Sequence, residues 1–204
     1  MSSSSESPFP IIYTERLHLR IFDPARDSDY DAVLTIYNSD FTRRAVGDTG
    51  LHSREDADVR CTKFHPLPKD FDPARPFPSH PWHLVYLRGT DTLVGVISLF
   101  LRHPLPYADL GYAVAEEHAN RGYATEAAKA ALRWWTDEMG VPNIWAASFD
   151  SNVASHRVAR KIGFVDGGSI RLLLSDTLTK EAKAFVRPGM ETSLDGLTVD
   201  VRQK

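Results

Sequence analysis

The chain contains a single cysteine, Cys61, among its 204 residues. One cysteine excludes an intramolecular disulfide framework and cannot by itself supply a zinc cluster. The histidines show neither H-x-x-x-H nor mixed Cys/His spacing, so no metal site is expected. This cysteine usage fits a reducing compartment, and we expect a cytoplasmic location.

Long apolar runs are also missing. No run approaches the roughly 18–20 residues that span a bilayer, and Met1 to Glu6 lack the basic and apolar regions of a secretory signal. We expect residues 1–10 to form a disordered tail. A composition that is 42% hydrophobic supplies one sizeable core, so residues 11–204 are expected to form a single domain.

An excess of charge is absent as well. The formal net charge of -3 gives no electrostatic reason to expect binding to nucleic acid or to a membrane surface. Neither is therefore an expected partner. The oligomeric state, monomer or homodimer, is left open by the sequence.

Proline, in contrast, is concentrated in one segment, residues 65–82, which holds six of the 13 prolines of the chain. Proline at this density ends helices and is excluded from central strands, so a long insertion loop is expected. Phe71, Phe77 and Trp82 favour a loop that packs onto the domain, over a substrate site. An ordered surface insertion is the alternative.

Alternating and helical patterns predict the remaining elements. Strands are expected at residues 17–21, 83–88, 93–101, 109–114 and 143–148, and Leu197, Val199 and Val201 alternate as in a further strand. Helices are expected from a cap at Asp27 or Ser28, over Ser53 to Phe64, from Ala124 to Met139, and from a cap at residues 150–152 to Ile162. Two helices, a three-strand meander and alternating strands and helices predict a mixed α/β fold.

The most informative stretch begins at the strand 109–114. It leads through Asn120-Arg121-Gly122-Tyr123-Ala124 directly into a long amphipathic helix. Gly122 permits a tight turn and the close approach of a ligand. The helix start has amides without intrahelical partners and a partial positive charge, so this turn is suited to an anion such as a pyrophosphate.

Three blocks of sequence together resemble the GCN5-related N-acetyltransferase (GNAT) superfamily, and within it the RimJ/RimL-like branch of ribosomal-protein N-acetyltransferases. The first block is Thr14-Glu15-Arg16-Leu17-His18-Leu19-Arg20. The second joins Asp109-Leu110-Gly111-Tyr112 to Asn120 through Ala127, and the third runs from Asp150-Ser151-Asn152 to Gly163-Phe164. The blocks occur in the family order and spacing over about residues 11–169.

The resemblance implies the GNAT fold, a mixed and mostly antiparallel central sheet flanked by helices, and acetyl-CoA as cosubstrate without a metal. It also implies the residues that hold acetyl-CoA. The pantetheine arm would pair with the backbone of Tyr112, Ala113 and Val114. The pyrophosphate would lie on the loop of Asn120, Arg121, Gly122, Tyr123, Ala124 and Thr125. Asn152 would bond to the arm, and Ser155 would face the sulfur.

The chain departs from the family pattern at two catalytic positions. Many members place a tyrosine acid seven residues after the asparagine, where this chain has Ala159, and some relatives place a glutamate base five residues before it, where Ala147 stands. Ala119 also replaces the Gln or Arg that commonly begins the family's loop. The family positions alone therefore do not supply the acid and the base.

Acetyl transfer to an amine requires a group that removes the ammonium proton and a group that protonates the leaving thiolate. Asp109 is the first candidate for the base, although an ordinary strand-end carboxylate is equally possible; Glu116 and Glu117 are further candidates that are more typical of solvated loop residues. Ser155 is the first candidate for the acid, with a helix-terminal hydroxyl bonded to backbone as its alternative. Tyr112 and Tyr123 are alternative acids or packing residues.

Two sets of basic residues also have two interpretations each, as phosphate ligands or as solvated side chains. Arg121 would meet a phosphate or remain solvated. His156, Arg157, Arg160 and Lys161 would assist the 3′-phosphate of CoA or form a solvated face.

These residues predict an N-acetyltransferase that moves acetyl from acetyl-CoA to a primary amine, a protein N-terminus or a small molecule, in a ternary complex. Direct attack is favoured because Cys61 lies outside the three blocks and is a poor covalent carrier. The alternatives are a CoA-binding module with weak or no catalysis and a nucleotide-binding regulatory protein. Gly122→Glu is expected to abolish CoA binding, and Asp109→Asn to lower the rate alone.

Overall fold

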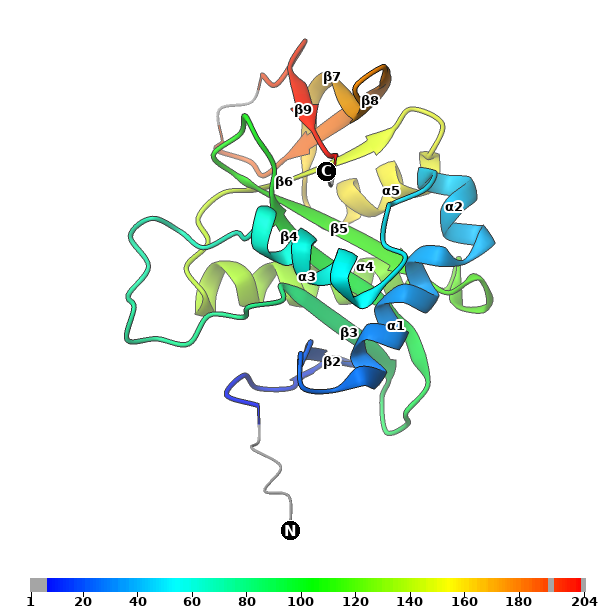
Figure 1. Cartoon of the computed structure of the whole chain (residues 1–204), viewed down its shortest axis with the longest axis vertical. Helices are drawn as coiled ribbons and strands as arrows, with labels where there is room; N and C mark the ends of the chain where they lie inside the picture. The colour runs from blue at the N-terminus through cyan, green and yellow to red at the C-terminus, as the bar shows by residue number, and fades with distance from the viewer. Residues whose placement is uncertain (1–6, 191–192, 203–204) are drawn as a thin grey trace.

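The computed structural model describes residues 7–190 and 193–202 (Figure 1). Within them, the chain forms nine strands and five α-helices. The elements are β1 (Ile12–Tyr13), β2 (Leu17–Ile21), α1 (Asp27–Asn38), α2 (Asp40–Val46), α3 (Arg54–Lys63), β3 (Trp82–Leu87), β4 (Leu93–Leu101), β5 (Ala108–Val114), α4 (Tyr123–Arg133), β6 (Ile144–Phe149), α5 (Val153–Lys161), β7 (Val165–Ser175), β8 (Leu178–Val186) and β9 (Thr198–Asp200).

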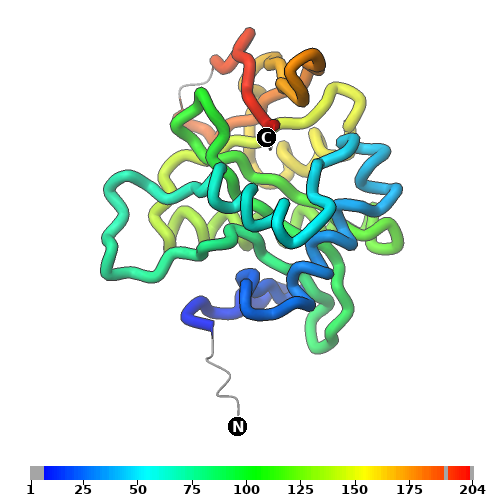
Figure 2. Tube along the Cα trace, viewed as in Figure 1, coloured from blue at the N-terminus to red at the C-terminus, as the bar shows by residue number. Residues whose placement is uncertain are grey.

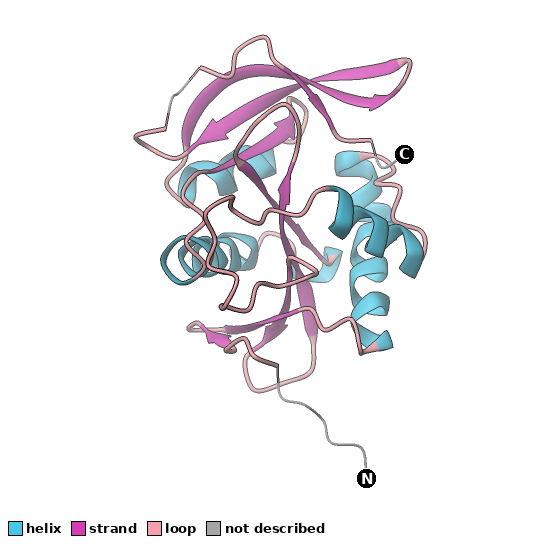
Figure 3. Ribbon diagram, turned by 60° about the vertical axis from the view of Figure 1, so that its left-hand side comes forward, coloured by secondary structure: helices cyan, strands magenta, loops and turns pink. Residues whose placement is uncertain are grey.

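The described strands belong to one sheet with the order β1-β2-β3-β4-β5-β6-β8-β7-β9. Neighbouring strands run antiparallel except for the β5–β6 and β7–β9 pairs. The helices lie on both faces of this sheet, as Figure 3 shows by element type. This arrangement confirms the predicted fold class, a mixed and mostly antiparallel sheet flanked by helices.

Alternation along the strands divides the interior into two layers. One core lies between the sheet and α4 and α5, and it takes Leu17, Leu19, Ile97, Leu99 and Leu110 from the strands. The other lies between the sheet and α1 to α3. It takes the strand residues in between, such as Leu84, Val96 and Phe100. A third cluster fills the end of the sheet formed by β6 to β9.

Neither α2 nor β8 has a counterpart among the predicted elements, for a physical reason in each case. α2 is a seven-residue helix in which only Thr42 is buried, so it lacks an apolar stripe that sequence periodicity would reveal. β8 begins with four exposed residues and is first buried at Ala182, in the middle of the strand, so its first half has no alternating pattern. Three helices, not the expected two, therefore precede the meander of β3, β4 and β5.

The helix predicted from Ala124 to Met139 changes its geometry near its end. α4 ends at Arg133, and the next residues form a π-helical turn over Trp134–Glu138. The amide of Met139 donates to the carbonyl of Trp134, five residues earlier, at 3.1 Å. The wider turn accompanies the burial of two adjacent tryptophans, which a regular helix would place about 100° apart.

Two predicted caps had different outcomes. Ser53 caps α3 as expected, because its hydroxyl accepts from the amide of Asp56 at 3.2 Å. The predicted cap at Asp27 or Ser28 is wrong: Arg26 occupies the N-cap position of α1 and makes no side-chain cap bond. Asp27 and Asp29 lie in the first turn instead, where the helix dipole favours carboxylates.

The proline-rich loop occupies residues 65–81, and the expected last residue, Trp82, begins β3. The loop extends to the left in the tube view of Figure 2, away from α2 and α5. Its aromatic residues do pack onto the domain: Phe71 and Phe77 stack edge to face at 5.0 Å, and Phe77 lies 5.6 Å from Trp135. The loop thus covers the C-terminal end of the α4 segment.

The predicted disordered tail lies mostly outside the described residues, which begin at residue 7. Within the described part, the ring of Phe9 packs edge-on against Trp134, with centroids 6.0 Å apart. Among residues 7–190 and 193–202, none of the helices combines the length and the apolar character that a bilayer crossing requires.

Candidate active site

The sheet opens between β5 and β6, its central parallel pair. These strands pair only at their beginnings, through Ala108 with Ile144 and Asp109 with Trp145. β5 continues to Val114 and β6 to Phe149, without further pairing between them within the described chain. Because both strands run in the same direction, their carboxyl ends form a wedge in the middle of the sheet.

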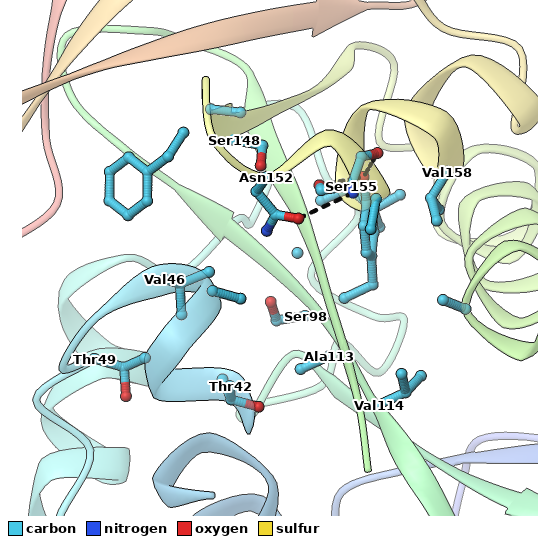
Figure 4. A pocket seen from close by; sticks show the side chains of 18 of the residues that line it. Thr42, Val46, Thr49, Ser98, Ala113, Val114, Ser148, Asn152, Ser155 and Val158 are labelled. Atoms are coloured by element: carbon cyan, nitrogen blue, oxygen red, sulfur yellow. Dashed lines mark hydrogen bonds between the residues drawn. The ribbon is translucent and has the colours of Figure 1, made fainter. Parts of the chain in front are cut away.

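A pocket of about 740 Å³ occupies this wedge. The unpaired residues of β5 and β6 line it, together with the starts of α4 and α5 on one side and residues of α1, α2 and α3 on the other. Figure 4 shows Thr42, Val46 and Thr49 across the pocket from Asn152 and Ser155, with Ser98 between them and Ala113 and Val114 of β5 toward the lower right.

The alternation of β5 assigns its pocket residues to the two faces of the sheet. Leu110 is buried in the core beneath α4 and α5, and Tyr112 packs against that core. Asp109 and Gly111 pair with Phe100 and Ser98 of β4 and share their face, toward α1 to α3. The pocket therefore passes through the sheet. We call the side beneath α4 and α5 the first mouth and the side facing α1 to α3 the second mouth.

The first mouth begins at the turn before α4. Gly122 is the N-cap residue, with φ +82° and no side chain to cap the helix, and Asn120 has the left-handed φ of +58°. The first helical bond is donated by the amide of Glu126 to the carbonyl of Gly122. The amides of Tyr123, Ala124 and Thr125 precede this ladder and remain available to a ligand.

Most of the predicted loop residues line the pocket; Arg121 does not. The lining includes Asn120, Gly122, Tyr123, Ala124 and Thr125. The Arg121 side chain is exposed, and its carbonyl accepts from Nη1 of Arg16 at 3.0 Å. Arg121 therefore takes part in the turn through its backbone.

The turn is braced by the first strand region, a role that the sequence did not reveal. Glu126, in the first turn of α4, accepts hydrogen bonds from the Thr14 hydroxyl at 2.6 Å and from the amide and Nε of Arg16 at 2.9 and 2.7 Å. The guanidinium of Arg16 also lies 4.7 Å from the centroid of the Tyr123 ring. Burial tends to raise the pKa of Glu126, but the hydrogen bonds from Thr14 and Arg16 together outweigh it, and the pKa is lowered. The carboxylate stays ionised and holds the turn.

Asn152 and Ser155 form the other edge of the first mouth. The side-chain oxygen of Asn152 accepts from the amide of Ser155 at 3.1 Å, which caps α5 (Figure 4). The cap uses Oδ1, and within the described chain the side-chain amide nitrogen has no recorded protein partner. Asn152 can thus cap the helix and donate to a ligand in the pocket.

Ser155 forms a pair with Tyr112. The hydroxyl of Tyr112 lies 2.9 Å from both the carbonyl oxygen and Oγ of Ser155. Burial raises the pKa of Tyr112 to about 12, and its hydroxyl also lies near the backbone amide of Ala159. The phenol of Tyr112 on β5 therefore lies beside Ala159, the position on α5 where many members of the family have a tyrosine.

Asp109 lies on the second mouth and forms an ion pair. Nε of Arg102 donates to Oδ2 of Asp109 at 2.8 Å, and both side chains are largely buried. Burial raises the pKa of Asp109, while Arg102 and the backbone amide of Ala147 oppose that rise. The residue is a buried carboxylate with a single guanidinium partner, not a solvated strand-end acid.

The other candidates occupy different places. Glu116 pairs with Arg44 at 2.9 Å on the surface, and neither Glu116 nor Glu117 lines the pocket. Of the basic residues of α5, Arg157 and Lys161 line the pocket. His156 is buried with Nε2 3.1 Å from the carbonyl of Phe149, and Arg160 lies over the ring of Phe185.

The second mouth contains residues that sequence reasoning missed. Tyr37, Thr49, Arg60, Ser98 and Arg102 all line it. Arg60 stands in the last turn of α3, where a basic residue is ordinarily a solvated partner of the helix dipole. No local pattern indicates that this guanidinium is buried, since its burial depends on how α3 packs on the sheet.

The proline-rich loop does not lie over the pocket. None of the lining residues belongs to this loop, so its expected position over a substrate site is wrong.

Cys61 is buried and does not line the pocket, and burial strongly raises the pKa of its thiol. In the described part of the chain, no group of three or more His, Cys, Asp or Glu side chains could hold a metal ion.

Comparison with protein families gives one match: residues 16–165 fit the model described as an acetyltransferase (GNAT) domain. The chain is similar to two proteins of Bacillus subtilis. One is the uncharacterized N-acetyltransferase YoaA, with 29% identity over 80% of this chain and 87% of that protein. The other is the uncharacterized N-acetyltransferase YnaD, with 32% identity over 74% of this chain and 81% of that protein.

Solved structures show the same fold at lower identity. An acetyltransferase from Agrobacterium tumefaciens matches with a TM-score of 0.61 and 22% identity, covering 87% of this chain and 94% of the other. A putative ribosomal-protein-serine acetyltransferase from Vibrio cholerae matches at 0.58 and 18% identity, covering 88% and 98%. RimL, an L7/L12 acetyltransferase solved in complex with coenzyme A, matches at 0.58 and 16% identity, covering 87% and 97%.

Proposed function

The chain belongs to the GNAT acetyltransferase family, and we propose that it transfers acetyl from acetyl-CoA to a primary amine by direct attack within a ternary complex. The observation that carries this proposal is the pocket that passes through the sheet between β5 and β6. Two substrates can enter a passage of this kind from opposite mouths and meet inside it.

The first mouth fits acetyl-CoA. The amides before the α4 ladder and the positive end of the helix dipole suit a pyrophosphate. The unpaired edge of β5 at Tyr112, Ala113 and Val114 offers backbone groups to an amide-bearing arm, and Asn152 offers its side-chain nitrogen. RimL, which has the same fold and was solved in complex with coenzyme A, supports CoA as the ligand of this mouth.

The second mouth would hold the amine, with Asp109 as the general base. A primary ammonium must lose a proton before its nitrogen can attack the thioester carbonyl carbon. A carboxylate whose pKa is raised by burial is a better proton acceptor than a solvated one, and Asp109 lies on the same face as the second mouth. The ion pair with Arg102 favours its ionised form.

The acid would be the Ser155–Tyr112 pair on the first mouth. As the C–S bond breaks, the thiolate takes the Ser155 hydroxyl proton, and Tyr112 can return a proton to Ser155 across their 2.9 Å contact. Because the pKa of Tyr112 is raised to about 12, the phenol remains protonated near neutral pH. Base and acid therefore lie on opposite faces of β5, as direct attack requires.

The covalent route has little support, because Cys61 is buried, away from the pocket and poorly ionised. The acceptor is proposed as a primary amine of a protein N-terminus or a small molecule. The fold shared with ribosomal-protein acetyltransferases supports the RimJ/RimL-like branch. The predicted cytoplasmic location and the oligomeric state, monomer or homodimer, stay predictions.

The test measures release of free CoA thiol from acetyl-CoA with a panel of primary amines, for the wild-type chain and for Asp109→Asn. We expect amine-dependent thiol release that falls sharply in the variant while CoA affinity is kept. CoA binding without turnover on any amine would favour the alternative, a binding module without catalysis. In a parallel assay, Cys61→Ala should retain activity, and intact-mass analysis should detect no acetylated enzyme.

A further inference from the structure

The second mouth contains a buried cation that forms no ion pair with any carboxylate of the described residues. Arg60 of α3 is 6% exposed and lines the pocket. Its recorded hydrogen bond is donated from Nη2 to the backbone carbonyl of Thr49. Nε of the same guanidinium has no hydrogen-bond partner in the described part of the chain.

A second unsatisfied donor lies beside it. The hydroxyl of Thr49 is buried, has no partner within the described residues, and belongs to a residue that lines the same pocket. Buried polar groups in native proteins are nearly always hydrogen-bonded, so each exception requires an explanation. Here two neighbouring residues, joined through the Arg60–Thr49 contact, both retain unused hydrogen-bonding capacity.

The charges around Arg60 form no ion pair with it among the described residues. Asp56, one turn earlier in α3, raises the pKa of Arg60 only weakly, and its carboxylate accepts from the amide of His52 and the hydroxyl of Ser53. Arg102 is also close and already pairs with Asp109, and Arg202 pairs with Asp200 and Asp176. Asp48 lines the outer part of the mouth but is 61% exposed, where its carboxylate is held by the amide of Gly50 and by His52. Burial, and next the charge of Arg102, lower the pKa of Arg60 to about 10, so it stays positive near neutral pH.

From the unsatisfied donors and this charge arrangement, and resting on the proposed function, we propose that the acceptor is a small primary amine that carries a carboxylate. The carboxylate would accept hydrogen bonds from Arg60 and from the Thr49 hydroxyl. A guanidinium suits this task because its planar donors match the two oxygens of a carboxylate. The amine end of the same molecule would then be directed toward Asp109, which lines the same mouth.

The assignment also has a physical motive. Burying a guanidinium without a counter-ion is costly, and a bound carboxylate would offset that cost. An acceptor amine without a carboxylate would leave the Arg60 guanidinium without a counter-ion in the complex. The site would therefore discriminate between acceptors chiefly by the group attached to the amine, since buried charges left unpaired weaken a complex strongly.

The kinetic test compares matched acceptors that differ in one group: glycine with glycinamide, β-alanine with its amide, and aminomethylphosphonate as a phosphorus analogue. For the wild-type chain we expect kcat/KM at least about 10-fold higher for each carboxylate than for its amide. In Arg60→Met, a substitution of similar length that keeps the site filled, the preference should fall to within about 2-fold. The Kd for CoA should change by less than about 2-fold.

Two further variants keep the test decisive. Arg60→Lys retains the charge without the planar donors and should keep part of the preference, whereas Thr49→Val should reduce it by about 3-fold without loss of folding. A preference that survives in Arg60→Met, or a wild-type preference for amides or for longer peptides, would overturn the proposal. A phosphonate preferred over both carboxylates would also overturn it.

Binding of a product analogue separates this inference from the proposed function. N-acetylglycine should raise the Tm of the wild-type chain in the presence of CoA, N-acetylglycinamide should not, and Arg60→Met should abolish the difference. If no amine is acetylated but this difference persists, the proposed transfer fails and the carboxylate site stands. If amines are acetylated without a carboxylate preference and N-acetylglycine has no effect, only the carboxylate site fails.

Discussion

The two mouths of the pocket differ in how completely their polar groups are satisfied. On the first mouth, the loop before α4 is fixed by the hydrogen bonds of Glu126 to Thr14 and Arg16, and α5 is capped by Asn152. Its unused donors are the backbone amides before α4 and the side-chain nitrogen of Asn152. On the second mouth, Arg60 and Thr49 have side-chain donors without partners in the described chain.

This difference indicates how each mouth selects its ligand. Backbone amides at a helix start bind any group of the right charge and shape, and side chains contribute mainly by holding the loop. Side-chain donors in a buried mouth depend on single residues, so that specificity can change by one substitution. Variants on the first mouth should therefore change the affinity for CoA, and variants on the second should change the choice or activation of the amine.

The largest effect should come from Gly122→Glu on the first mouth. Gly122 has φ +82°, where a residue with a side chain is strained by about 1–2 kcal/mol. An added Cβ would lie 3.4 Å from Nη2 of Arg16, so a glutamate would disturb the Arg16 brace and add negative charge at the phosphate turn. We expect the Kd for CoA, measured by calorimetry, to rise at least about 1,000-fold, or about 4 kcal/mol.

The matched control for this substitution is Gly89→Glu, at a glycine with φ +75° in the β3–β4 hairpin, outside the pocket lining. It carries the same backbone strain and the same added charge, and it should leave the Kd for CoA unchanged. CoA affinity retained in Gly122→Glu would remove the assignment of this turn to the pyrophosphate.

On the second mouth, Asp109→Asn should lower kcat about 100-fold with little change in the Kd for CoA. Burial raises the pKa of Asp109, so the base is lost by protonation at a higher pH than for an ordinary aspartate. The wild-type rate should therefore fall as pH decreases through this raised pKa, and the variant should lack that acid limb. Steady-state rates across pH give both results.

Glu117→Gln, at an exposed acid outside the pocket lining, is the control for Asp109→Asn and should preserve the acid limb. An unchanged pH–rate profile in Asp109→Asn would exclude Asp109 as the base. It would also weaken the division of the pocket into an affinity mouth and an activation mouth.

The same two mouths show how far the sequence alone reaches. Gly122, Asn152 and the strand before them could be predicted because helix starts, caps and glycine turns are local features with direct sequence signals. The predicted pocket residues of β5 and α5 also line one pocket. A mixed α/β fold followed from the same local periodicities, and the mostly antiparallel sheet was implied by the resemblance to the GNAT superfamily.

The second mouth could not be predicted in this way. Arg60 looks like an ordinary basic residue in the last turn of a helix, and only the packing of α3 on the sheet buries it. Tyr112 was considered as an acid, but its contact with Ser155 depends on the placement of α5 against β5. The position of the proline-rich loop, on Trp135 and not over the pocket, likewise depends on tertiary contacts.

Tyr112→Phe tests whether the acid belongs to the first mouth. Removing the hydroxyl leaves Ser155 without its proton partner, so kcat should fall about 10-fold while the Kd for CoA is kept. Because the pKa of Tyr112 is raised to about 12, the loss should be the same at every pH of an ordinary assay, unlike the loss in Asp109→Asn. Tyr123→Phe, which also lines the pocket, should be nearly neutral; a larger loss there than in Tyr112→Phe would transfer the acid role to Tyr123.

The smallest effect should come from the brace of the first mouth. Arg16→Gln removes the ion pair with Glu126 and the contact with the Tyr123 ring, so the turn before α4 is less well held. The Arg16 side chain is 44% exposed, which limits the stabilisation of such a pair to about 1 kcal/mol. We expect the Kd for CoA to rise about 5-fold with kcat unchanged.

Arg54→Gln is a close control for Arg16→Gln. Arg54 also pairs with a carboxylate, Asp27, and lies over a tyrosine ring, but it is outside the pocket lining. If both variants weaken CoA binding equally, the brace acts through general stability; if only Arg16→Gln does, the first strand region positions the phosphate turn.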